Sequence, residues 1–167
     1  MNSSQPQQDS APKGPGALPQ RSSGGSGPDT QIRRLALFGT KGVVGRSRDF
    51  ARDSLHDWNW LPATDNPDRQ ASADDVLLVV SELVTNACLH AGGPTSLQLR
   101  GSADMVRVEV YDPSAQRPRP RTVQDRARPG GHGLYVIDRL ARRWGVTVHQ
   151  DGSGKAVWAE VAAPPNY

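Results

Sequence analysis

Three polar side chains recur every four residues in the segment 81–92, which reads SELVTNACLHAG. They are Glu82, Asn86 and His90. On an α-helix this spacing places the three side chains along nearly one line. Such a line is a solvated helix face, a metal site, or one wall of a nucleotide pocket. Taken alone, residues of these types are more often solvated. Here they come after the apolar run VLLVV (76–80), where a helix should bury a face, and buried Glu and Asn need partners that a bound ion or ligand can supply.

The spacing argues against zinc. A zinc site needs three or four ligands at close range, whereas Glu82 and His90 lie two turns, about 12 Å, apart on a helix. We expect His90 to pack or hydrogen-bond at the helix end, and Cys88, beside the line, to be a core residue. As the single cysteine, Cys88 excludes an internal disulfide framework and fits a reducing compartment, so the expected localisation is cytoplasmic.

Three further positions attract attention because of the chemistry their residue types allow. Asp112 ends an alternating apolar segment, where an aspartate is usually a turn former. The run GGHG (130–133) precedes a helical pattern, and a glycine-rich helix N-terminus presents free N–H groups that hold phosphate. Segment 117–128 carries five arginines and one aspartate, and its prolines favour an extended loop that is either solvated surface or a functional loop. The arginines are residues 117, 119, 121, 126 and 128.

The elements that must position these residues can be predicted from hydrophobic periodicity. A strand is predicted over 32–39, and a helix over 44–58. Turn residues occupy 62–68, and Ser72 with Asp75 resembles a capping box that opens a helix from about 73 to 91.

The second half of the chain alternates as strands do. Strands are predicted over 96–100 and 105–112, with Leu97, Leu99, Val106, Val108 and Val110 facing inward. After GGHG, a helix is predicted whose apolar face runs from Leu134 to Trp144, with Gly145 as its C-terminal cap. Strands over 146–150 and 155–161 then form a hairpin around DGSG.

The resulting order, β-α-α-ββ-loop-α-ββ, predicts an α/β fold, a two-layer sandwich. Its sheet has about five mostly antiparallel strands, with about three helices on one face. In residues 1–30, 16 are Gly, Pro or Ser. Such a segment cannot bury enough apolar surface to fold, so we expect a disordered tail over 1–31 and one domain over 32–163. The chain shows no secretory signal pattern and no apolar run long enough for a membrane span, so no membrane partner is expected.

The order of these motifs resembles the histidine kinase-like ATPase superfamily, which has the Bergerat fold. It is most similar to the small bacterial anti-sigma-factor serine kinases, and the resemblance covers about residues 32–162. The matching motifs are Glu82-Leu83-Val84-Thr85-Asn86, Val110-Tyr111-Asp112-Pro113, Gly131-His132-Gly133-Leu134 and Gly154-Lys155-Ala156-Val157-Trp158.

The resemblance implies a role for each candidate residue. Asn86 would hold Mg²⁺ through its carbonyl oxygen, and Glu82 would be the general base toward a serine hydroxyl. Asp112 would accept a hydrogen bond from the exocyclic amine of adenine. The nucleotide would also be bound by Gly131, His132, Gly133 and Leu134, and the arginine segment falls where the family has its lid.

Two motifs depart from the family pattern. Pro113, Ser114 and Ala115 come after the aspartate where relatives often have glycines. The last hairpin usually has Gly-Thr, and Lys155 or Ala156 occupies that neighbourhood here. Outside the predicted sandwich only the tail remains, so we expect no phospho-accepting histidine domain, which argues against a sensor histidine kinase.

The predicted function is that of an ATP-binding regulatory protein with the cofactors ATP and Mg²⁺. It would be an anti-sigma factor with protein serine/threonine kinase activity, and its partners a sigma factor and an anti-sigma-factor antagonist. Relatives commonly pair, so a homodimer is also implied. The alternative is a non-catalytic ATP-binding adaptor. Direct nucleic-acid binding is disfavoured, because the arginine segment has neither interleaved aromatics nor a recognisable docking helix.

Overall fold

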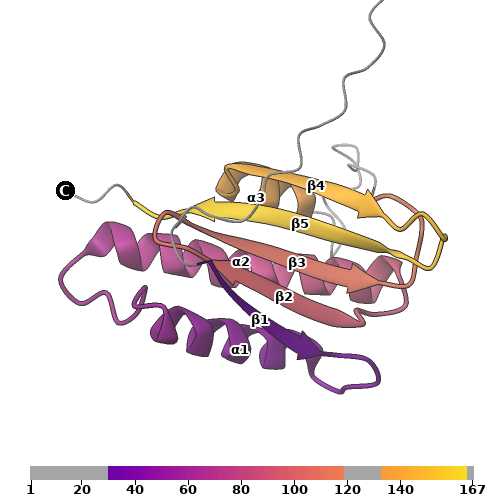
Figure 1. The fold of residues 1–167 in the computed structure, drawn as a ribbon, viewed down its shortest axis with the longest axis horizontal. Coiled ribbons are helices and arrows are strands. Elements are labelled where there is room, and N and C mark those ends of the chain that lie inside the picture. The colour runs from indigo at the N-terminus through magenta and orange to yellow at the C-terminus, as the bar shows by residue number, and fades with distance from the viewer. Residues whose placement is uncertain (1–29, 119–132, 165–167) are drawn as a thin grey trace, which may run out of the picture.

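The computed structural model describes residues 30–118 and 133–164, which form three helices and five strands (Figure 1). Residues 1–29 of the expected tail and 119–128 of the arginine segment lie outside the described residues, whereas Gln31, the last residue assigned to the tail, begins β1. The elements are β1 (Gln31–Ala36), α1 (Val43–Asp57), α2 (Pro67–His90), β2 (Ser96–Gly101), β3 (Met105–Asp112), α3 (Gly133–Leu140), β4 (Arg143–Val148) and β5 (Lys155–Ala162). This is the predicted order of elements.

The strands form one sheet in the order β1-β2-β3-β5-β4, and each neighbouring pair is antiparallel. The helices lie against one face of this sheet (Figure 1). As predicted, Leu97, Leu99, Val106, Val108 and Val110 point into the core, and none is more than 1% exposed. The two-layer α/β sandwich is therefore confirmed.

Helix α2 begins earlier than the sequence predicted. It starts at Pro67 rather than near residue 73, because Asn66 caps it: the Asn66 side chain accepts a hydrogen bond from the Arg69 N–H at 3.0 Å. Proline at the first helical position costs no hydrogen bond, and Asp68 in the first turn suits the positive end of the helix dipole. The segment NPD, predicted to be a turn, is thus a helix start.

Helix α3 ends earlier than predicted, at Leu140. The Arg142 N–H donates to the Glu160 carbonyl at 2.8 Å, so the chain joins the sheet directly. Trp144 and Gly145, predicted as the end of the helix, lie in β4. Gly145 has a packing reason to be there, since a Cβ on it would lie 2.6 Å from the Trp158 indole.

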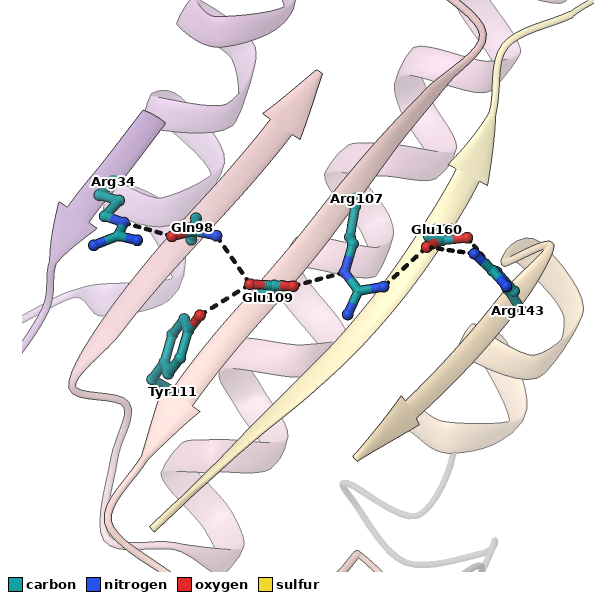
Figure 2. Close-up of polar contacts among 7 residues, drawn as sticks. All are labelled: Arg34, Gln98, Arg107, Glu109, Tyr111, Arg143 and Glu160. Atoms are coloured by element: carbon teal, nitrogen blue, oxygen red, sulfur yellow. Dashed lines mark hydrogen bonds and ion pairs between the residues drawn. The ribbon is translucent and has the colours of Figure 1, made fainter. Parts of the chain in front are cut away.

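The sheet face opposite the helices carries a row of polar contacts that crosses every strand (Figure 2). Arg107 lies at its middle, donating to Glu109 on its own strand at 2.6 Å and to Glu160 on β5 at 2.9 Å. Although none of the three described helices covers this face, Glu109 and Glu160 are only 6% and 2% exposed. The row consists of Arg34, Gln98, Glu109, Tyr111, Arg107, Glu160 and Arg143.

Within residues 30–118 and 133–164, no helix combines the length and the apolar character needed to cross a membrane.

Candidate functional site

The central helix α2 carries the line of polar residues at its C-terminal end. Glu82 and Asn86 are half-buried, while their neighbours Leu83, Val84 and Ala87 are buried in the core. Helix α2 packs against β3 and β5 on one side and against α3 on another. The two polar side chains therefore lie at the margin of the core and not on a freely solvated helix face.

The first residue of α3 lies directly against these two side chains. A Cβ placed on Gly133 would be 2.8 Å from Oδ1 of Asn86 and 3.0 Å from Oε2 of Glu82. Any larger residue would have to push both polar groups aside. Glycine at this position thus lets the start of α3 approach both polar groups closely, and three residues predicted for the site from two separate segments converge here.

The other candidate residues of these two segments are Leu134, Gly131, His132 and His90, and they differ in their burial and in whether the structure describes them. Leu134 is half-buried and packs against the hydrophobic core. Gly131 and His132 lie outside the described residues. His90, the last residue of α2, is exposed, where a histidine in the last turn suits the negative end of the helix dipole.

Cys88 is exposed, which corrects the expectation that it is a core residue. On α2 it comes directly after the buried Ala87, and the helix turn carries it away from the sheet. Partial burial raises the pKa of its thiol, which disfavours the reactive thiolate form.

Asp112 occupies the end of β3 on the side that faces the helices. Asp112 points to the same face of the sheet as Val108 and Val110, and it is 4% exposed. Its Oδ1 accepts a hydrogen bond from the Ser114 N–H at 2.9 Å, which closes a tight turn. A second hydrogen bond to the same Oδ1 comes from Nζ of Lys155 at 2.8 Å.

Lys155 joins the candidate site through its contact with Asp112, and the sequence indicated it only as one of two residues near the last hairpin. It pairs directly with Asp112 across the β3–β5 ladder. Its Nζ also donates to the Ser114 carbonyl at 3.0 Å, and the side chains of Lys155 and Asp112 are 5% and 3% exposed. The sequence signal was a lone lysine at the start of an apolar strand, but only the strand register identifies its partner.

Gly154 allows this contact to form. Its φ of +147° is a conformation that glycine adopts readily and L side chains rarely do. A Cβ on this residue would lie 2.1 Å from the carbonyl oxygen of Asp112. The turn between β4 and β5 can therefore lie against the end of β3, which brings Lys155 to Asp112.

The side chains at the candidate site suit a cation that is bound partly by the protein and partly by phosphate oxygens. Among residues 30–118 and 133–164, no three His, Cys, Asp or Glu side chains gather in a way that could hold a metal. The carboxamide oxygen of Asn86 and the carboxylate of Glu82 are hard oxygen donors that lie close to one another across Gly133. Mg²⁺ is commonly held by one or two such protein oxygens, with phosphate oxygens and waters completing its shell, so the residues present fit it.

Comparison with protein families gives a match to the model described as histidine kinase-like ATPase domain, over residues 51–161. The match includes Glu82, Asn86, Asp112, Gly133 and Lys155. No curated protein matches the chain.

Proposed function

Because the chain belongs to the histidine kinase-like ATPase domain family, we propose that it is a protein serine/threonine kinase that uses Mg-ATP. We propose further that it acts as an anti-sigma factor and phosphorylates an antagonist protein on serine. ATP binding follows from the family. The observation that supports the kinase proposal is the convergence of Glu82, Asn86 and Gly133, because it brings the carboxylate of Glu82 close to the carboxamide of Asn86, the proposed ligand of Mg²⁺.

The proposed roles divide the site into two ends. At the sheet, Asp112 accepts a hydrogen bond from the exocyclic amine of adenine. At the helices, Asn86 holds Mg²⁺, and the absence of a Cβ on Gly133 leaves room for its side chain and that of Glu82. Bound Mg²⁺ neutralises charge on the phosphate oxygens. Asn86 therefore fixes where the phosphates lie relative to Glu82.

Glu82 acts as the general base in the transfer step. The serine oxygen forms a bond to the γ-phosphorus, the bond from this phosphorus to the β–γ bridging oxygen breaks, and ADP leaves with the electron pair. The proton of the serine hydroxyl passes to the carboxylate of Glu82. A non-catalytic adaptor would bind Mg-ATP without this step, so it is the alternative against which the step must be tested.

The test separates binding from transfer. Calorimetry with Mg-ATP should show binding to the wild type, loss of binding in Asn86→Ala, and near-wild-type binding in Glu82→Gln. With [γ-³²P]ATP and a panel of candidate antagonists, wild type should label serine and Glu82→Gln should lose about 100-fold or more of the rate, as expected for a general base.

Asp74→Asn is the matched control, because it makes the same chemical change at an exposed position on α2. It should leave binding and transfer unchanged. If wild type binds Mg-ATP but labels none of the antagonists, the kinase proposal fails and the adaptor function remains. Full transfer by Glu82→Gln would remove this residue from the base role.

A further inference from the structure

The ion pair between Asp112 and Lys155 is buried at the end of the site where the base of the nucleotide would lie. The two side chains are 3% and 5% exposed. Taking two charges out of water is costly, and this cost is offset only by close pairing and further hydrogen bonds. Here the Nζ–Oδ1 distance is 2.8 Å, and Nζ also donates to the Ser114 carbonyl. Apolar residues of similar volume would fill the same space without that cost, so the pair calls for another explanation.

The hydrogen-bonding capacity of the pair is only partly used by the described residues. A lysine ammonium has three donors, and two of them have acceptors, on Asp112 and Ser114. A carboxylate has two acceptor oxygens. Both hydrogen bonds that described residues give to Asp112, from Ser114 and Lys155, reach Oδ1. Within the described part of the chain, one donor of Lys155 and Oδ2 of Asp112 thus remain available next to one another.

A neighbouring donor and acceptor match the edge of an adenine ring. Adenine presents the N6 amine, a donor, beside N1, an acceptor. Guanine reverses both groups, because it presents the carbonyl O6 beside a protonated N1. If Asp112 faces position 6 of the ring, Lys155 faces position 1. With guanine, the acceptor O6 would face the acceptor carboxylate of Asp112. The protonated N1, a donor, would face the donor ammonium of Lys155.

We propose that Lys155 is a specificity-determining residue that donates a hydrogen bond to N1 of adenine, while Asp112 accepts one from N6. This inference rests on the proposed binding of ATP, and it assigns the recognition of N1 to a side chain of this protein. The ion pair holds both groups in position before the nucleotide arrives. Lys155 thereby adds a second point at which guanine is rejected, beyond the one that Asp112 alone supplies.

The experiment varies the nucleotide first, since this leaves the protein intact. The dissociation constants of ATP, 1-deaza-ATP and 7-deaza-ATP are measured for the wild type by calorimetry. 1-deaza-ATP lacks the N1 acceptor, and 7-deaza-ATP is the control that keeps both N1 and N6. Wild type should bind 1-deaza-ATP about tenfold or more weakly than ATP, a difference of ~1.4 kcal/mol, and should bind 7-deaza-ATP like ATP. GTP should bind at least about 100-fold more weakly than ATP.

The protein variants then test whether Lys155 causes this preference. Lys155→Met should bind ATP about tenfold more weakly, lose the distinction between ATP and 1-deaza-ATP, and bind GTP with a smaller disadvantage. Lys41→Met is the matched control at an exposed lysine and should behave as wild type. Should Lys155→Met not fold, the wild-type comparison of ATP, 1-deaza-ATP and 7-deaza-ATP decides alone.

The outcomes separate this inference from the proposed function. Equal wild-type affinity for ATP and 1-deaza-ATP overturns the role of Lys155 and leaves ATP binding in place. Retained discrimination in Lys155→Met also overturns it. A wild-type protein that binds none of these nucleotides overturns both the inference and the proposed function.

Discussion

Gly133 shows how a single missing Cβ can organise a site. Its Cα lies against the polar ends of Glu82 and Asn86, which belong to a helix far away in the sequence. The contacting atoms are the ends of flexible side chains, so a small residue at position 133 would move them and not the backbone. Position 133 therefore affects the placement of these groups more than it affects the fold.

Gly133→Ala should reduce Mg-ATP affinity about tenfold or more while leaving the free energy of unfolding within about 1 kcal/mol of wild type. The added Cβ displaces Asn86 and Glu82 by a few tenths of an ångström, but alanine also favours the helix. Calorimetry and urea denaturation measure the two quantities. Wild-type affinity in this variant would show that the close approach to Asn86 has no part in binding.

Gly45→Ala is the control for this change. Gly45 is an exposed helical glycine of α1, and a Cβ there meets nothing within 4 Å. The substitution should raise the free energy of unfolding by about 0.5–1 kcal/mol and leave ATP affinity unchanged.

At the residue scale, the sequence predicted the site only as far as a motif can. The roles of Glu82, Asn86 and Asp112 stay predictions that rest on the order of the motifs, because the helical spacing and the strand end are each more often typical of solvated residues and turns. The pairing of Asp112 with Lys155 depends on strand register across 43 positions of chain, which no local pattern encodes. The exposure of Cys88 likewise depends on how α2 is rotated against the sheet.

At the scale of elements, α2 is the support on which the site is built. It is 24 residues long, and its middle is buried on several sides by the sheet, α1 and α3. The sequence predicted its existence and its C-terminal end, but it placed the start about six residues too late. The cause is that Asn66 and Pro67 are equally typical of turns and of helix N-termini, and the choice depends on whether the residues after them bury a helical face.

Asn66→Ala should lower the free energy of unfolding by about 1 kcal/mol, the usual cost of losing an N-cap. The Asn66 side chain accepts from the Arg69 N–H, and alanine leaves that donor without this partner. The change is measured by urea denaturation. Asn66→Asp keeps the acceptor and should remain close to wild type. Equal free energies of unfolding for Asn66→Ala and wild type would mean that the cap hydrogen bond of Asn66 does not stabilise the protein.

The end of α3 was missed for a related reason. Leu134, Ile137, Leu140, Ala141 and Trp144 have helical spacing, yet the same Trp144 also fits the alternation of a strand. Pairing with β5 decides between them, because Trp144 lies opposite Ala159 and Gly145 opposite Trp158. Tertiary pairing thus overrode local periodicity over the last residues of the predicted helix.

At the scale of the whole molecule, the row of polar contacts ties all five strands together on the face away from the helices (Figure 2). Nothing in the local pattern predicted it, because its members come from five strands and meet only in this strand order. Glu160 is the member on β5 and accepts from Arg107 and Arg143.

Glu160 should make stability depend on pH in the acid range. Hydrogen bonding from Arg143 is the largest influence on its carboxyl and, together with Arg107, holds the pKa below its usual value despite the opposing effect of burial. A lowered folded-state pKa stabilises the protein above the unfolded-state value, about 4.3. This stabilisation is lost as the pH falls through the lowered pKa of the folded protein.

The measurement compares the urea denaturation of wild type and Glu160→Gln from pH 7 to pH 3. The variant should be less stable by about 1–3 kcal/mol at pH 7, as expected for a lost hydrogen bond to a charged group. The difference should shrink as the pH falls below about 4.3. A difference that stays constant over this range would exclude Glu160 as a source of the acid sensitivity.

The position of β5 has a consequence for biosynthesis. This strand is the last described element of the chain, yet it lies inside the sheet between β3 and β4 (Figure 1). While the ribosome is still making α3 and β4, one edge of β3 lacks its neighbour and Asp112 lacks Lys155. The nascent chain therefore contains Glu82, Asn86 and Asp112 of the candidate site before Lys155 is made, and until β5 pairs an open strand edge is exposed to chaperones and to aggregation.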